Sequence, residues 1–222
     1  MWALLMAGFM VTAPSALETA RDRQDRPALQ KMVDDYSAVS AKNPNDAAAQ
    51  YRLALAASYA AEVAIEQRDR NQAQQAAERG IKAAEKAVAL NPGDAENYRL
   101  LATLYGQAIT DVLSGLSYGP RVKDAIGKAV AKAPRSSSVY VARGVGNYYL
   151  PAQLGGGTDL AIADFRKAIE LDARNSEAWL WLGIALRKDK KDNEARQAFQ
   201  KALELNPNRV WAKQQLDKTP AK

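Results

Sequence analysis

The 222-residue sequence contains no cysteine and no histidine. These absences exclude disulfides, zinc fingers, thiol nucleophiles, Ser-His-Asp triads and metal sites held by histidine. Aromatic residues make up only 7% of the chain, and no segment shows the alternation of apolar and polar residues that is typical of a β-strand. Carboxylate pairs such as Asp34 and Asp35 are adjacent on a predicted helix, so they cannot converge on one substrate atom. We therefore predict a helical protein that is not an enzyme and that holds no cofactor and no metal.

Charge is nearly balanced in the first half of the chain, whereas basic residues are in excess in the second half. Residues 1–119 carry 12 basic and 14 acidic side chains, hence a net charge of −2; residues 120–222 carry 19 and 11, hence +8. In the second half lysine and arginine alternate with aspartate and glutamate, as in KAIELDARNSEAW, which is typical of a solvated helix surface with ion pairs. No stripe of aromatic and basic residues accompanies the charge, so we expect no nucleic-acid partner.

The first residues form a short apolar run. Trp2–Val11 is uncharged and is followed by the small residues of Thr12–Ala16, a pattern that favours a signal peptide over residues 1–16. A bilayer-spanning helix needs about 20 apolar residues, which is more than this run supplies. We therefore predict a periplasmic or secreted protein in which residues 17–26 are a polar linker. The alternatives are an uncleaved N-terminal anchor that associates the protein with a membrane, and a plain N-terminal helix.

A 34-residue unit from Ser176 to Arg209 carries the most specific pattern. Positions 4, 7, 8, 20, 24, 27 and 32 of this unit are Trp179, Leu182, Gly183, Ala195, Phe199, Ala202 and Pro207. Seven of eight signature positions of a tetratricopeptide (TPR) repeat thus hold the expected residue type, and only Leu186 at position 11 departs. The unit resembles the TPR family. This resemblance implies an all-α, right-handed superhelical solenoid of antiparallel helix hairpins, which stack because no single hairpin can bury its apolar face.

Turns of similar sequence divide the chain into hairpins. NPND, NPGD, APRS, DARN and NPNR end at residues 46, 94, 136, 175 and 209; in most of them proline stops one helix and the last residue caps the next. A single helix at Pro27–Lys42 is predicted to precede the hairpins. The predicted TPR solenoid spans 27–218, with hairpins at about 46–90, 94–133, 136–171 and 176–205, a capping helix at 210–218 and a tail at 219–222.

The spacing between these turns shrinks along the chain, from 48 residues to 42, 39 and 34, so the hairpins carry insertions of 14, 8, 5 and 0 residues. The first insertion, Glu62–Gln75, contains strong helix formers and is predicted to lengthen both helices of its hairpin. The second, Ser114–Pro120, and the third, Leu150–Gly157, contain glycine and proline and are predicted to be loops.

In TPR arrays the first helix of each hairpin lines the concave surface, so the resemblance implies a set of residues that face a groove. They are Tyr51, Leu55, Tyr59, Arg99, Thr103, Val141, Val145, Tyr148, Tyr149, Leu180, Ile184, Arg187 and Lys188. The groove is apolar and rich in tyrosine, which suits an amphipathic helix or an extended peptide of a protein partner. In the alternative interpretation, side chains of the chain itself fill the groove.

The stretch LPAQLGGGTDLAIADFRKAIELD at residues 150–172 is the second most specific feature, and its three glycines favour a sharp re-entry turn. It resembles exported bacterial TPR proteins over about Tyr140–Leu205, among them the T-component family of tripartite ATP-independent periplasmic (TRAP) transporters. This resemblance implies a periplasmic scaffold or adaptor. We therefore predict a non-enzymatic protein-interaction scaffold of the cell envelope. The alternatives are a structural subunit that self-associates or joins a larger membrane-associated complex, and a periplasmic transporter accessory component.

Overall fold

In the computed structural model of the protein, residues 15–221 are described, and all regular structure in that range is helical. The helices are α1 (Ala16–Asp22), α2 (Arg26–Lys42), α3 (Ala47–Glu66), α4 (Arg70–Leu90), α5 (Ala95–Gln107), α6 (Val112–Lys132), α7 (Ser137–Tyr149), the short 3-10 helix η1 (Ala152–Leu154), α8 (Thr158–Leu171), α9 (Ser176–Lys188), α10 (Asp192–Leu205) and α11 (Val210–Asp217). The apolar run of the predicted signal peptide or anchor falls in residues 1–14, which lie outside this range.

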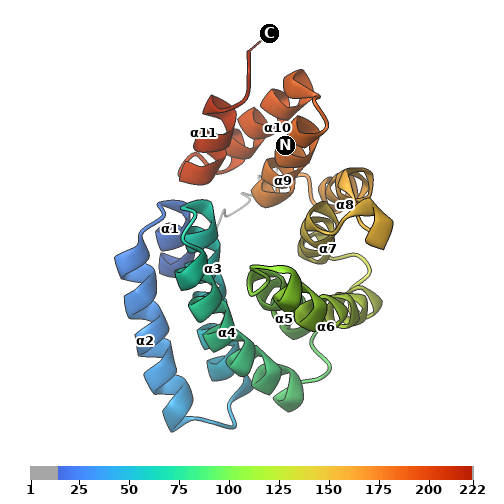
Figure 1. Ribbon diagram of the computed structural model, residues 1–222. Helices are drawn as coiled ribbons and strands as arrows, with labels where there is room; N and C mark the ends of the chain where they lie inside the picture. Colours follow the sequence, from blue (N-terminus) through green and yellow to red (C-terminus); the bar gives the residue numbers. More distant parts are fainter. Residues whose placement is uncertain (1–14, 222) are drawn as a thin grey trace, which may run out of the picture.

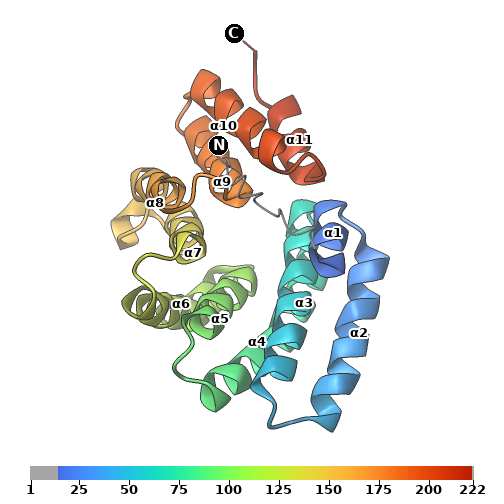
Figure 2. The same cartoon turned by 180° about the vertical axis from the view of Figure 1, so that it is seen from behind.

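Successive helices pack as hairpins, α3 with α4, α5 with α6, α7 with α8 and α9 with α10, and each hairpin packs on the next. Helix α2 lies against α3 at one end of the array, and α11 lies against α10 at the other. The array curves so strongly that α11 approaches α1 and α3 (Figures 1 and 2). Helices α5, α7 and α9 face the hollow, and α6, α8 and α10 lie outside them (Figure 1). The predicted TPR-type solenoid is thereby confirmed.

Polar side chains in the turns begin the inner helices. Asp46, Asp94, Ser136 and Asn175 each accept a hydrogen bond from a backbone N–H in the first turn of α3, α5, α7 and α9, respectively. Such bonds satisfy amide groups that have no partner inside the helix. The same kind of cap therefore starts the first helix of every hairpin.

Part of the predicted polar linker, residues 17–26, is helical. Ser15 and Glu18 form a capping box at the start of α1, with the Glu18 amide donating to Ser15 Oγ at 3.2 Å and the Ser15 amide donating to Glu18 Oε2 at 2.8 Å. Leu17 and Ala20, three residues apart, are buried in the same core as α3. The charge content of this segment suggested an extended spacer. Its capping box and its apolar face instead make it a helix that packs on the core.

The predicted loop at Ser114–Pro120 is also helical. Asp111 and Ser114 form a capping box, with the Ser114 amide donating to Asp111 Oδ1 at 2.8 Å, and α6 therefore begins at Val112. Helix α5 ends at Gln107, so the connection is 108–111, and Pro120 lies inside α6 on its exposed side. The Asp111 cap outweighs the glycine and proline content that suggested a loop.

The other two insertions take separate forms. The first lengthens α3 and α4 to 20 and 21 residues, which confirms the prediction for that hairpin. The third contains η1 and a turn in which Gly155 and Gly157 have φ of +86° and +112°. These positive values strain any residue with a Cβ, which explains the glycines.

The apolar interior consists of two clusters of side chains. One unites α1 to α5, with Tyr118 and Val122 of α6 packed against it, and it contains many alanines. The other unites α7 to α11 and is built around Phe165 and Phe199, both fully buried. We call these clusters the N-terminal core and the C-terminal core.

Candidate partner-binding surface

The residues of the predicted groove lie on α3, α5, α7 and α9. In its N-terminal half, Tyr51 donates its hydroxyl to Glu96 Oε1 at 2.9 Å, and Arg99 Nε donates to Glu96 Oε2 at 2.7 Å. Thr103 Oγ1 donates to the Arg99 carbonyl at 3.1 Å. Burial, followed by the nearby Glu96 carboxylate, raises the pKa of Tyr51. These polar groups are satisfied within the protein, so this half of the groove needs no ligand to complete it.

Tyr59 in the same half stacks with a cation, because the Arg21 guanidinium lies 4.9 Å from its ring centroid. Burial raises the pKa of Tyr59 to about 12. Leu55 is half-buried and packs against the N-terminal core. Helix α1 therefore covers part of the predicted groove at this end.

The C-terminal half of the inner face carries a cluster of aromatic rings on α7, α9 and α11. Tyr149 lies edge-on to Tyr148 at 5.0 Å between ring centroids and to Trp181 at 6.2 Å, and Trp181 lies 5.3 Å from Trp211. Lys188 Nζ sits 4.2 Å above the Tyr148 ring and donates to the Tyr148 carbonyl at 3.1 Å. We call Tyr148, Tyr149, Trp181, Trp211 and Lys188 the aromatic surface.

Tyr149 is the most accessible ring of the aromatic surface, with 63% of its surface exposed. Burial among the inner helices raises its pKa to about 12, with smaller contributions from Tyr148 and from Glu66 of α3. The ring thus packs against neighbouring aromatic side chains and stays open to solvent.

Two residues of the predicted groove belong to the core instead, and this corrects the prediction. Leu180 is fully buried and Ile184 is 5% exposed, both in the C-terminal core. Helix α9 packs against α7, α8 and α10, so most of its circumference is covered. Only a narrow strip of such a helix can meet a partner, and spacing within a repeat does not say which strip.

The remaining predicted residues are partly engaged. Val141 and Val145 are half-buried on α7, and Val145 packs against the C-terminal core. Arg187 donates to the Gln215 carbonyl at 3.0 Å and to Gln215 Oε1 at 2.5 Å, so its guanidinium joins α9 to α11. The sequence-based prediction did not include Trp181 and Trp211. Trp181 could have been found, because it directly follows Leu180, a predicted groove position.

A second group that sequence reasoning missed joins the two ends of the array. The Arg209 guanidinium, 2% exposed, donates to Glu62 Oε1 at 2.6 Å, Glu66 Oε1 at 2.5 Å and Glu177 Oε1 at 2.9 Å. Arg21 lies 3.3 Å from the same Glu177 oxygen and donates to Asp22 Oδ1 at 2.9 Å. These six side chains come from α1, α3, α9 and the turn before α11. We call them the clasp.

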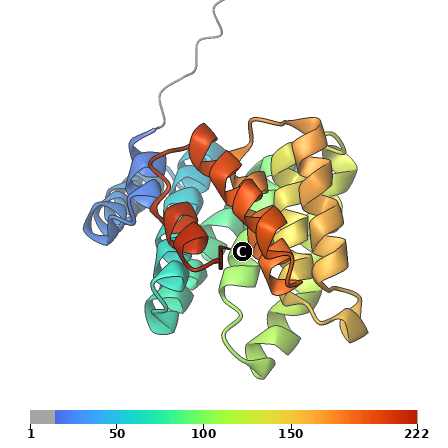
Figure 3. The same ribbon diagram turned by 90° about the horizontal axis from the view of Figure 1, so that it is seen from above.

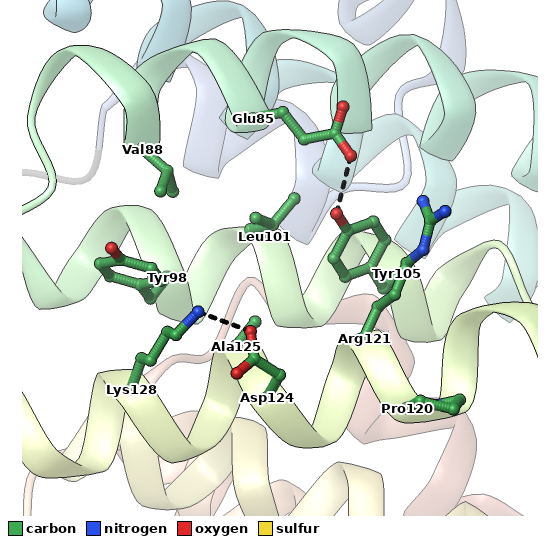
Figure 4. A pocket seen from close by; sticks show the side chains of 10 residues that line it. All are labelled: Glu85, Val88, Tyr98, Leu101, Tyr105, Pro120, Arg121, Asp124, Ala125 and Lys128. Atoms are coloured by element: carbon green, nitrogen blue, oxygen red, sulfur yellow. Dashed lines mark hydrogen bonds and ion pairs between the residues drawn. The ribbon is translucent and has the colours of Figure 1, made fainter.

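The outer surface has a pocket of about 540 Å³ between α4, α5 and α6, shown in Figure 4. Four of its polar side chains bond in pairs: Tyr105 donates to Glu85 Oε1 at 2.7 Å, and Lys128 donates to Asp124 Oδ2 at 2.7 Å. Residues 15–221 contain no group of acidic side chains arranged to hold a metal ion, and none of their helices is long and apolar enough to cross a membrane. The aromatic surface therefore remains the best candidate for a binding site.

Two family profiles match separate parts of the chain. The sequence profile described as "Regulator of microtubule dynamics protein 1-3" matches residues 16–151, and a tetratricopeptide repeat profile matches residues 155–210. No curated protein sequence matches the chain.

Solved structures with similar folds include a thermophilic TPR protein of Thermus thermophilus. It has a TM-score of 0.60 and 21% sequence identity, over 86% of this chain and 91% of that one. The HusA haemophore of Porphyromonas gingivalis has a TM-score of 0.59 and 17% identity, over 78% of this chain and 94% of that one. At such identities the likeness establishes the fold alone, which is a TPR fold, typical of scaffolds for protein interaction.

Proposed function

Because the chain belongs to the regulator of microtubule dynamics protein 1-3 family and carries a TPR unit, we propose that it is a scaffold that binds a segment of another protein on its inner face. The observation that carries the proposal is the aromatic surface. Tyr149 is 63% exposed while it touches Tyr148 and Trp181. Exposed aromatic rings gathered on a concave face are typical of binding sites, because they offer large contact areas at a low cost in conformational entropy.

The binding mechanism follows from the positions of these groups. Tyr149 and Trp181 supply apolar ring surface on which aliphatic or aromatic side chains of a partner segment pack. The pKa of Tyr149 is raised to about 12, so at neutral pH the hydroxyl is protonated and can donate a hydrogen bond to a carbonyl of the partner. Burial of rings supplies most of the affinity, and the hydroxyl and Lys188 set the orientation.

The proposal is tested by site-specific photocrosslinking in native cells. A benzophenone amino acid replaces Tyr149, and a matched variant carries it at Leu160, a 48% exposed residue on the outer helix α8. We expect one dominant crosslinked protein from position 149 and none from position 160. Trp181→Ala in the first variant should reduce the crosslink several-fold. Equal crosslinks from both positions, or none from position 149, would contradict the proposal.

We further propose that the protein works in the cell envelope, on the basis of the apolar run Trp2–Val11 followed by small residues. Mass spectrometry of the mature protein's N-terminus tests this. A chain that starts near Ser15 or Ala16 supports an exported adaptor, and an intact Met1 supports an anchored or assembled subunit.

A further inference from the structure

The two ends of the array meet through polar side chains. The N-terminal and C-terminal cores each join several helices, but neither core includes residues from both ends of the array. The connections across the junction that the structure describes are the clasp, Asn206 Nδ2 donating to Asp22 Oδ2 at 2.8 Å, and Gln24 with Gln214 at 3.2 Å. Figure 3 shows the same arrangement from above, with α11 beside α1 and α3. The junction is therefore held by these polar contacts, and neither apolar core extends across it.

In a polar junction of this kind, the cost of removing charges from water and the attraction between the ions nearly cancel. Removing charges from water costs several kcal/mol per ion, and the mutual attraction of the buried ions offsets that cost only when geometry is good. Arg209 and Glu66 are almost fully buried, at 2% and 1% side-chain exposure, so both sides of this balance are large. A small change in charge can then decide whether the junction forms.

The clasp also contains more negative than positive charge. Its four carboxylates, Asp22, Glu62, Glu66 and Glu177, face only two guanidiniums, Arg21 and Arg209. With every group ionised, the net charge is −2. One added proton on a carboxylate halves this excess and removes a repulsion between neighbouring acids.

We propose that the clasp is a latch that opens and closes the hollow of the array, and that its protonation controls access of a partner to the inner face. Glu62 is the group best placed to respond. Its Oε1 accepts from Arg209 at 2.6 Å, and Arg21, Glu177 and Glu66 are the other charged groups that act on it. Burial raises its pKa from 4.5 to about 7, and burial likewise raises the pKa of Glu66.

The direction of the response follows from linkage. A carboxyl whose pKa is higher in the closed array than in the open one takes up a proton on closure, so closure is favoured as pH falls through about 7. Above that pH the extra negative charge favours the open array. Each unit of difference between the two pKa values changes the ratio of open to closed molecules by about tenfold. The Glu177 carboxylate acts in the opposite direction at lower pH, because burial, which would raise its pKa, is outweighed by Arg209 and Arg21, which lower it.

The latch is tested by pulsed electron paramagnetic resonance between spin labels on the full chain, which contains no native cysteine. One pair, Arg70→Cys with Lys213→Cys, spans the junction at exposed positions. The control pair, Asp35→Cys with Lys86→Cys, lies on α2 and α4 within the N-terminal half. We expect a single short distance across the junction at pH 6, a second and longer one at pH 8.5, and no change in the control pair.

Two variants identify the cause. Glu62→Gln keeps the shape of the side chain without its charge, and we expect the closed distance at both pH values. Arg209→Met, checked for folding by helicity and by the control pair, should give the long distance at pH 6 as well. Should that variant fail to fold, the pH comparison with Glu62→Gln still decides.

A distance distribution that does not change with pH would overturn the latch. So would a pH response that persists in Glu62→Gln. The claim that opening admits a partner rests on the proposed function. The opening itself does not, because the distances are measured without a partner. If position 149 gives no crosslink but the distances change with pH, the proposed scaffold function is contradicted and the latch is supported. If position 149 gives a crosslink but the distances do not change with pH, the scaffold function is supported and the latch is contradicted.

Discussion

The two halves of the array solve the same packing problem with different residues. At positions 8 and 24 of the repeat the first hairpin has Ala54 and Ala84, both buried in the N-terminal core. The last hairpin has Gly183 and Phe199 at these positions, and a Cβ on Gly183 would lie 2.6 Å from Phe199 Cε1. The third hairpin repeats this arrangement, since a Cβ on Gly144 would lie 2.5 Å from Phe165 Cε1.

This comparison shows that two TPR helices can cross either with two small residues at their closest approach or with one glycine facing one large ring. The alanine solution suits the long helices α3 and α4, which approach closely over many turns. The glycine–phenylalanine solution suits the 13- and 14-residue helices of the last hairpin, where one ring fills the centre. The two cores are therefore distinct in chemistry although they belong to one repeating fold.

The largest expected effect comes from deleting a central ring. Phe199→Ala removes a fully buried side chain, and we expect a loss of about 3–5 kcal/mol in the free energy of unfolding. Because the two cores are separate, hydrogen exchange should show faster opening of α7 to α11 with little change in α2 to α4. Leu104→Ala in the N-terminal core is the matched variant and should show the reverse pattern. Uniform loss of protection along the chain in both variants would mean that the halves unfold as one unit.

A smaller effect tests the close approach of Gly183 to the Phe199 ring. Gly183→Ala places a Cβ 2.6 Å from the Phe199 ring, which cannot move away because it is fully buried. We expect a destabilisation of about 1–3 kcal/mol in urea unfolding. Combining it with Phe199→Leu makes room for the new Cβ, and the double variant should be more stable than the sum of the two single effects predicts, by about 1 kcal/mol. If the two destabilisations simply add, the side chains at positions 183 and 199 do not compete for the same space.

The next effect concerns the junction where the halves meet again. Burial raises the pKa of Glu62 from its ordinary value of 4.5 to about 7. Between these two pH values the folded protein therefore keeps a proton on Glu62 that the unfolded chain has released. The free energy of unfolding should therefore fall as pH rises between these values, by on the order of 1–2 kcal/mol. Urea unfolding of the wild type and of Glu62→Gln at a series of pH values measures this. The variant should lose the dependence; an equal slope in both proteins would assign it to other groups.

The smallest effect lies in α6, the helix between the two cores. A Cβ at Gly127 would meet nothing within 4 Å, and the residue is exposed in the helix interior. Gly127→Ala should therefore raise stability by about 0.5–1 kcal/mol through helix propensity. Thermal unfolding compares it with Gly183→Ala, in which the same substitution should destabilise. Agreement in sign between the two variants would refute the contact between Gly183 and Phe199.

Much of the architecture could be predicted from local patterns. The unit at Ser176–Arg209 identified the fold, because its small and large residues recur at fixed positions on two helix faces. The loop at Ser114–Pro120 was predicted wrongly, because the Asp111 cap favours a helix over a stretch that contains glycine and proline. The candidate site remains a prediction, and the structure shows only which of its residues are accessible. Tyr149 is on the inner face and exposed, whereas Leu180 and Ile184 are buried by neighbours that spacing alone does not place.

The sequence by itself determined the hairpins, their turns and the caps that begin the inner helices, because these depend on residues within a few positions of one another. Only the tertiary structure decided that the two ends meet, that Arg209 reaches Glu62 across 147 positions of sequence, and that Trp181 and Trp211 join the tyrosines. The meeting point of a superhelix depends on the sum of all the angles between its helices. Those angles are set by the volumes of packed side chains and by the lengths of the insertions, which no single repeat contains.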